Sequence, residues 1–132
     1  MDAIEQLLAM DKGKFKPQTR KVKIERLSTE DTPFYVELTG LTADEVAEMQ
    51  DMMIKFVDGK ATVDTLESEL ATVNKGVTNI NFNDEKLKKH LGVRTPYDAI
   101  KTIFNKGEIS GISNHINDIS GYKGDAVTEV KN

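Results

Sequence analysis

Three polar side chains near the C-terminus, Ser113, His115 and Asp118, are of the residue types that form a nucleophilic triad. A triad needs its nucleophile, base and orienting acid to converge in space beside an oxyanion hole. The surrounding isoleucines recur every three or four residues, which predicts a helix. Positions two apart on a helix do not face each other. The spacing therefore favours a polar helix face over a catalytic centre.

Metal and phosphate chemistry find no better support. The two histidines, His90 and His115, stand in neither an HxxxH nor an HExxH pattern, and the acidic residues form no EF-hand loop. The stretch NKGEISG, residues 105–111, lacks the GxxxxGK spacing of a phosphate-binding loop. The absence of cysteine excludes thiolate nucleophiles, disulfides and iron–sulfur clusters. We expect no catalytic residues, no metal site and no cofactor, and hence not an enzyme.

A basic helix-turn-helix is an alternative that would bind DNA. Residues 84–104 predict a helix, a turn at Gly92 and a second helix. The segment carries Lys86, Lys88, Lys89, Arg94 and Lys101, Lys106 follows just after it, and residues 12–26 are also basic. The second helix, however, has no arginine and few amides with which to read bases. A formal net charge of −4 and a pI near 5.2 also disfavour nucleic acid.

The length and composition allow one domain with a modest core. The chain has 132 residues, of which 38% are hydrophobic, and it has no tryptophan. Its N-terminus lacks the pattern of a signal peptide, and no apolar stretch approaches the roughly 20 residues that span a bilayer. We therefore expect a cytoplasmic protein with no membrane partner.

The N-terminal third predicts a short helix followed by a hairpin. Residues 2–10 have apolar positions at helical spacing, and residues 11–21 form a lysine-rich linker with Gly and Pro. Two alternating runs, 20–27 and 34–40, flank the polar cluster STEDTP, residues 28–33. Such runs around a short polar turn predict a β-hairpin with one apolar face that needs a cover.

The next segment, residues 42–57, predicts a helix that covers this hairpin. Thr42 and Glu45 have the spacing of a capping box. The helical stripe that follows comprises Val46, Met49, Met53, Phe56 and Val57, and Asp58–Gly59 would end the helix.

Three further helices complete the predicted fold. Leu66, Leu70, Val73 and Val77 indicate one that ends near Gly76. Asn83 or Asp84 can cap the next, Gly92 suits its end, and Pro96 suits a first helical turn.

The stretch GEISGISNHINDISGY, residues 107–122, predicts a packing helix. Its structural motif comprises Gly107, Glu108, Ile109, Ile112, Ile116, Ile119, Gly121 and Tyr122. We expect the four isoleucines to form one buried seam of the helix. The negative charge of Glu108 in the first turn interacts favourably with the helix dipole, and Gly121 is suited to end the helix. The fold class is thus α+β: a hairpin at about 20–40, covered by a bundle of about five short helices at about 42–121. We expect a single domain, residues 1–122, and a disordered, flexible tail, 123–132.

A candidate partner surface lies on the helix predicted at 42–57. Met52 and Ile54 fall outside its main stripe, and methionines suit varied apolar partners. The candidate partner-binding residues are Met49, Met52, Met53, Ile54 and Phe56. The alternative is that this extra face packs on the hairpin or on the C-terminal helices.

Residues 81–122 contain, in order, the motifs Gly92-Val93, Thr95-Pro96, Gly107-Glu108-Ile109 and Ser120-Gly121-Tyr122. These motifs resemble the C-terminal region of XkdN-like phage tail assembly chaperones. The N-terminal half is similar through Val22–Leu27, Phe34–Leu38 and Leu41–Glu45, so the resemblance covers residues 1 to about 122. The chain departs from the pattern at Asn83, where the family often has Pro, and at Ile112, where it often has Leu.

This resemblance implies a non-enzymatic role in building a phage or prophage tail. The implied partner is the tape measure protein, which the chaperone would keep soluble, with no small-molecule substrate. The tail tube protein and a second copy of the chain are further candidate partners. The implied location is the bacterial host cytoplasm, and the chaperone would be absent from the mature virion. The alternatives are a small helix-turn-helix DNA-binding protein and a structural phage tail component.

Overall fold

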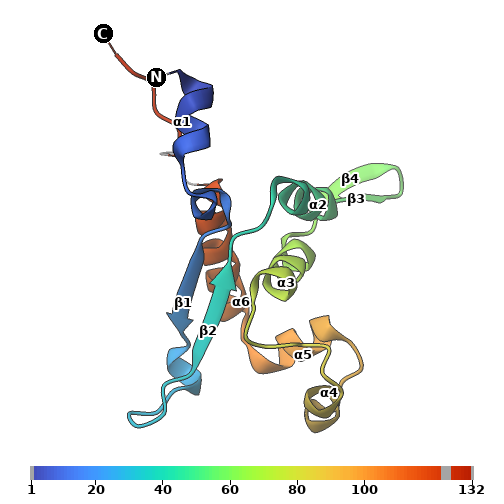
Figure 1. Ribbon diagram of the computed structural model, residues 1–132. Helices are drawn as coiled ribbons and strands as arrows, with labels where there is room; N and C mark the ends of the chain where they lie inside the picture. The colour runs from blue at the N-terminus through green and yellow to red at the C-terminus, as the bar shows by residue number, and fades with distance from the viewer. Residues whose placement is uncertain (1, 123–125, 132) are drawn as a thin grey trace.

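The computed structural model describes residues 2–122 and 126–131 (Figure 1). The described residues form an α+β fold, which confirms the predicted fold class. The helices are α1 (Ala3–Ala9), α2 (Ala43–Met53), α3 (Thr65–Gly76), α4 (Glu85–Leu91), α5 (Pro96–Ile103) and α6 (Lys106–Asn117). The strands are β1 (Thr19–Lys23), β2 (Tyr35–Thr39), β3 (Ile54–Val57) and β4 (Lys60–Val63). Of the tail expected to be flexible, residues 123–125 and 132 lie outside the described residues, and 126–131 hold no helix or strand.

Strands β1 and β2 form the predicted antiparallel hairpin, with Val22 opposite Val36. Their connection is longer than the predicted short turn, because β1 already ends at Lys23 and a 3₁₀ turn, Glu25–Leu27, follows it. The Ser28 hydroxyl organises this connection: it accepts from the backbone N–H of Phe34 at 2.8 Å and donates to a backbone carbonyl. The hairpin therefore keeps its register across a long loop.

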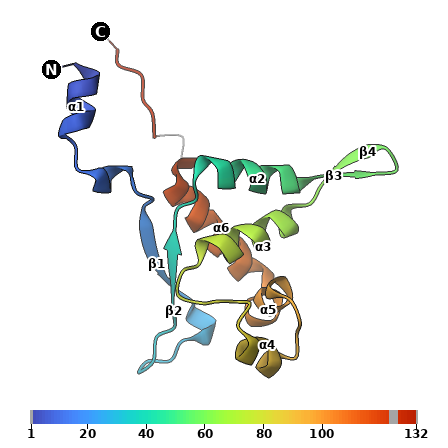
Figure 2. The same ribbon diagram turned by 45° about the vertical axis from the view of Figure 1, so that its right-hand side comes forward.

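Helix α6 provides the cover for this hairpin. It lies against β2, while α2 packs on α3 (Figures 1 and 2). The prediction that the helix starting at Thr42 covers the hairpin was therefore wrong. The buried side chains Val36 and Leu38 of β2 belong to the same core as Ile116 of α6. The alternation of apolar and polar residues in β2 predicts which face of the strand is buried. It does not predict which helix packs on that face.

The helix predicted at 42–57 ends at Met53, four residues early. Its capping box is present, since the Thr42 side chain accepts from the backbone N–H of Glu45 and the Glu45 carboxylate accepts from that of Thr42. Residues 54–57 instead form β3, which pairs with β4. Asp58 and Gly59 between the strands have φ angles of 52° and 77°. Two consecutive positive φ angles make the tight turn that matches the twist of a two-residue hairpin.

The C-terminal helices begin and end where local signals place them. Asp84 caps α4, which ends at Gly92 with a φ of 71°. Thr95 caps α5, and Pro96 occupies its first turn. Asn105 caps α6 in a capping box with Glu108. Across residues 2–122 and 126–131, no helix combines the length and the hydrophobicity that a membrane span requires.

Candidate functional site

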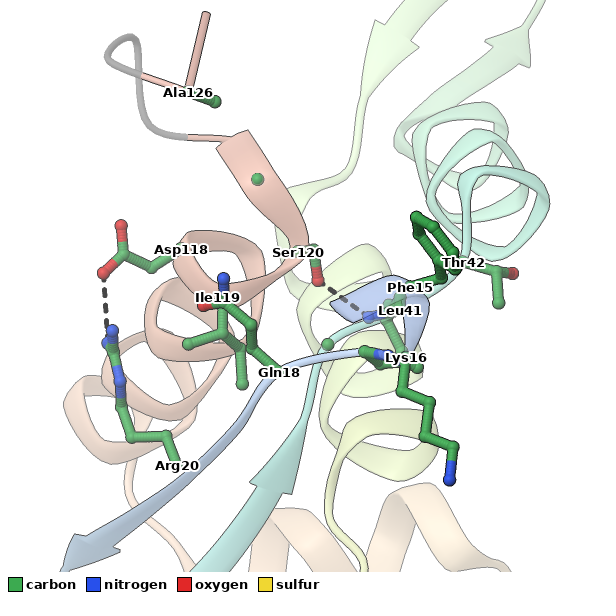
Figure 3. A pocket seen from close by; sticks show the side chains of 13 residues that line it. Phe15, Lys16, Gln18, Arg20, Leu41, Thr42, Asp118, Ile119, Ser120 and Ala126 are labelled. Carbon is green, nitrogen blue, oxygen red and sulfur yellow. Dashed lines mark hydrogen bonds and ion pairs between the residues drawn. The ribbon is translucent and has the colours of Figure 1, made fainter. Parts of the chain in front are cut away.

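A groove of about 720 Å³ lies where the N-terminal arm meets the end of α6 (Figure 3). Residues 15–18 of the arm form one side. The rest is formed by residues 40–42, between β2 and α2, by residues 118–121, and by Arg20 of β1 and Ala126. The groove thus joins three segments that are far apart in the sequence.

The floor of the groove is fixed by a contact of Ser120. Its hydroxyl accepts from the backbone N–H of Leu41 at 2.8 Å and donates to the carbonyl of Ile116 at 2.6 Å. A Cβ at Gly40 would lie 2.7 Å from the Ile119 carbonyl oxygen, so only glycine allows this approach. The junction between β2 and α2 is therefore held against the end of α6.

An ionic cluster forms one wall of the groove (Figure 3). The Arg20 guanidinium lies 3.0 Å from the Asp118 carboxylate and donates to His115 Nδ1 at 2.8 Å. Ser113, the third residue that the sequence made a triad candidate, is buried with 3% of its surface exposed. The structure thus places His115 and Asp118 in a bridge between β1 and α6, and it buries Ser113.

A second ion pair ties the start of α6 to the hairpin. Arg26 Nη2 lies 2.8 Å from Glu108 Oε1 and donates to the Ile103 carbonyl at 2.7 Å. The hydrogen bond from the Arg26 guanidinium lowers the pKa of the Glu108 carboxyl and raises the pKa of Arg26 itself. Besides its interaction with the helix dipole, Glu108 therefore connects α6 to the β1–β2 hairpin.

The rest of the predicted structural motif forms a buried seam. All four isoleucines are at most 7% exposed: Ile109, Ile112, Ile116 and Ile119. Gly107 lies in the first turn of α6, and Gly121 has a φ of 92°, in the left-handed region that ends a helix. The side chain of Tyr122 lies outside the described residues.

The predicted partner-binding residues do not share one exposed surface. Met49 is only 4% exposed and belongs to the core, because this side of α2 packs on α3. Met52 and Met53 are half-buried. Ile54 is 55% exposed, but it begins β3 instead of continuing the helix. Phe56 lies in β3, and its side chain lies outside the described residues.

A family model described as "Phage XkdN-like tail assembly chaperone protein" matches residues 4–131. The chain belongs to this family. Two of the motifs that carried the resemblance make tertiary contacts in this tail assembly chaperone. Glu108 forms an ion pair with Arg26 after β1, and the Ser120 hydroxyl accepts a hydrogen bond from the backbone N–H of Leu41 before α2.

The structure is also similar to the crystal structure of the protein yqbn. The TM-score is 0.58, the alignment covers 80% of this chain and 88% of that one, and the identity is 14%. At this identity the similarity shows a shared fold alone. No curated protein matches the chain.

The helix-turn-helix candidate, α4 and α5, uses several of its cations inside the chaperone. Lys88 is buried, and its ammonium lies 2.9 Å from the Asn83 side-chain oxygen. Lys101 pairs with an aspartate of its own helix, and Lys106 lies 2.6 Å from Glu69. Of the six basic side chains in and just after this segment, three are therefore engaged in intramolecular contacts, which adds no support for DNA binding.

Sequence inspection missed two exposed apolar regions. Ile4, Leu7 and Leu8 of α1 are 69%, 51% and 80% exposed, and α1 contains no buried residue. Val57, at the end of β3, is 55% exposed. The helical spacing of the α1 residues was visible in the sequence, but the lack of a covering element was not. Asp58–Gly59, which the sequence analysis predicts as a helix stop, instead forms the turn of the β3–β4 hairpin.

Proposed function

We propose that this chaperone binds the phage tape measure protein and keeps it soluble during tail assembly, without catalysing a reaction. Membership of the tail assembly chaperone family carries the proposal. A tape measure protein is a long helical chain, and its apolar stripes would aggregate if left exposed. A bound acidic protein covers such stripes, and its net charge of −4 adds solubility.

The surface that we propose for this partner is the outer end of α2 with the β3–β4 hairpin. It comprises Met52, Met53, Ile54, Phe56 and Val57. Ile54 and Val57 are each 55% exposed, and the hairpin extends away from the helices in both views (Figures 1 and 2). A lone two-stranded hairpin is marginally stable in water, so a partner that packs on it also stabilises it.

The proposed binding is weak at each site, since the chaperone must leave when tail tube subunits polymerise around the tape measure. We expect micromolar affinity, about −8 kcal/mol per site. Many copies along one tape measure compensate through avidity. The chaperone then acts in the host cytoplasm and is absent from the mature virion.

A binding measurement with purified tape measure segments tests this surface. The double variant Ile54→Ser, Val57→Ser should weaken binding about tenfold or more, because both exposed apolar contacts are lost. The matched control is Val127→Ser, Val130→Ser, since these valines are 89% and 86% exposed in the tail. Equal binding by the hairpin variant and the wild type contradicts the proposed surface.

Two other experiments separate the alternatives. Retention on DNA that falls steeply with salt would favour the helix-turn-helix function. Recovery of the chain in purified phage particles would favour a structural tail component.

A further inference from the structure

The N-terminus presents an apolar surface that the described part of the chain leaves uncovered. Helix α1 stands apart from helices α2 to α6 in both views (Figures 1 and 2). Its exposed residues Ile4, Leu7 and Leu8 are followed by Phe15, which is 59% exposed. A helix of seven residues is marginal in water without tertiary contacts. A further contact would therefore stabilise α1.

Positive charge is concentrated directly after this helix. Residues 12–26 hold seven Lys and Arg but one Glu. Four of these cations have intramolecular contacts: Arg20 with Asp118, Lys21 over the Tyr35 ring, Lys23 with Glu25, and Arg26 with Glu108.

The three lysines nearest α1 remain available. Lys12, Lys14 and Lys16 are exposed and have no ion pair within residues 2–122 and 126–131. We define the N-terminal strip as Ile4, Leu7, Leu8, Lys12, Lys14, Phe15 and Lys16. It combines an apolar helix face with three free positive charges.

Helix α2 carries the complementary charge. It has four acidic residues and no basic residue. Asp44, Glu48 and Asp51 are exposed and share one helix face through their i, i+4, i+7 spacing. Asp44 and Asp51 have no ion pair within the described residues, and Glu48 makes one contact, at 3.8 Å from Lys75.

The acidic residues of α2 and the three lysines of the strip also span similar lengths. At 1.5 Å per residue, the acidic face of α2, defined as Asp44, Glu48 and Asp51, extends about 10 Å. Lys12 and Lys14 lie in a 3₁₀ helix, Lys12–Phe15, and Lys16 follows it. At 2.0 Å per residue, the three lysines extend about 8 Å. Ala43 and Ala47 are exposed beside the acidic face, where their small side chains allow a close approach by the apolar part of the strip.

We propose that the N-terminal strip of one copy docks on the acidic face of α2 in a second copy. The two surfaces belong to different elements, so the contact is head-to-tail and leaves one of each free on a dimer. Longer chains or a closed ring of copies follow as the concentration rises. Nucleic acid is the weaker occupant, because phosphates cannot cover the apolar side chains of the strip. Salt screens the attraction between the exposed charges.

Analytical ultracentrifugation of the full chain over a concentration series tests the proposal. We expect reversible association that weakens as salt rises. Variant A, Lys12→Glu with Lys14→Glu and Lys16→Glu, should weaken association roughly tenfold or more. Variant B, Asp44→Lys with Glu48→Lys and Asp51→Lys, should do the same. Mixing A with B should restore association, because the unchanged face of A meets the unchanged strip of B and the reversed strip of A meets the reversed face of B.

A matched control separates this contact from an effect of net charge. Lys86→Glu with Lys89→Glu and Arg94→Glu changes the net charge as variant A does, but at exposed positions in and just after α4. This control should associate like the wild type.

Three results overturn the proposal. They are a monomer at every concentration, equal loss in variant A and in the control, and failure of the A and B mixture to associate. A wild-type chain that stays monomeric but shifts the mobility of DNA, with variant A failing to do so, would assign the strip to nucleic acid instead.

Discussion

Gly76, the last residue of α3, lies directly against Ile116 in α6. A Cβ built at Gly76 would lie 2.8 Å from both Cγ atoms of Ile116, a side chain with no exposed surface. Real Cβ atoms essentially never approach another heavy atom so closely. The absence of a side chain at one position therefore sets the distance between the two helices that form the centre of the fold.

Gly76→Ala should destabilise the protein by about 1–3 kcal/mol, because the added methyl overpacks a buried contact. The control is Gly111→Ala in the interior of α6, where an added Cβ meets nothing within 4 Å. That change should stabilise by about 0.5–1 kcal/mol, since alanine favours a helix interior. Urea denaturation measures both. Equal effects of the two substitutions would contradict the close contact.

Ile116→Asp should unfold the protein, since a carboxylate placed in the isoleucine seam has no partner there. Ile116→Val removes only one methylene and should cost about 0.5–1.5 kcal/mol. Asn114→Asp introduces the same carboxylate at an exposed position of α6 and should have little effect. Circular dichroism with temperature distinguishes these cases. Wild-type melting of Ile116→Asp would mean that the seam is exposed and available to a partner.

Ser120→Ala should cost about 1 kcal/mol, because it removes the hydroxyl that bonds the Leu41 amide. Deleting the exposed hydroxyl in Thr128→Ala should change the free energy of unfolding little. Hydrogen exchange at the Leu41 amide is the sharper readout, since exchange should accelerate in the Ser120 variant alone. Unchanged protection there would show that the amide has another acceptor.

The Arg26–Glu108 pair predicts a pH dependence of stability. The folded-state pKa of Glu108 lies below its ordinary value of 4.5. The pair's stabilisation is therefore fully present above that value and is lost as the pH falls through the lowered pKa. Glu108→Gln should melt at a lower temperature than the wild type at neutral pH, and the difference should shrink in acid. The exposed Glu30→Gln should show no such difference, and a Glu108 variant matching it would contradict the pair's role.

Local signals in the sequence predicted most of the elements of this fold. Thr42 with Glu45, Gly92 and Pro96 each satisfy a backbone requirement within a few residues, so their effects were visible in the sequence. The isoleucine spacing likewise marked the buried side of α6. These features depend on the chain's immediate neighbours and not on the tertiary arrangement.

The features that sequence inspection missed depend on tertiary packing or on competition between two local patterns. Ile54 and Phe56 continue the apolar spacing of α2, but Asp58–Gly59 favours a hairpin turn, and the hairpin prevailed. The burial of Met49 and the exposure of Leu8 depend on which helices lie nearby. The contacts of Glu108 with Arg26 and of Ser120 with Leu41 join residues about 80 apart, so no local pattern could predict them.

Co-expression with the tape measure protein of the same phage is the decisive test of the proposed chaperone function. The measurement is the amount of soluble tape measure protein with and without this chain, together with co-purification of the two. If the chain is a tape measure chaperone, solubility rises in its presence and the two proteins purify together. Tape measure protein that is equally soluble, or equally aggregated, in both cultures would contradict the proposed function.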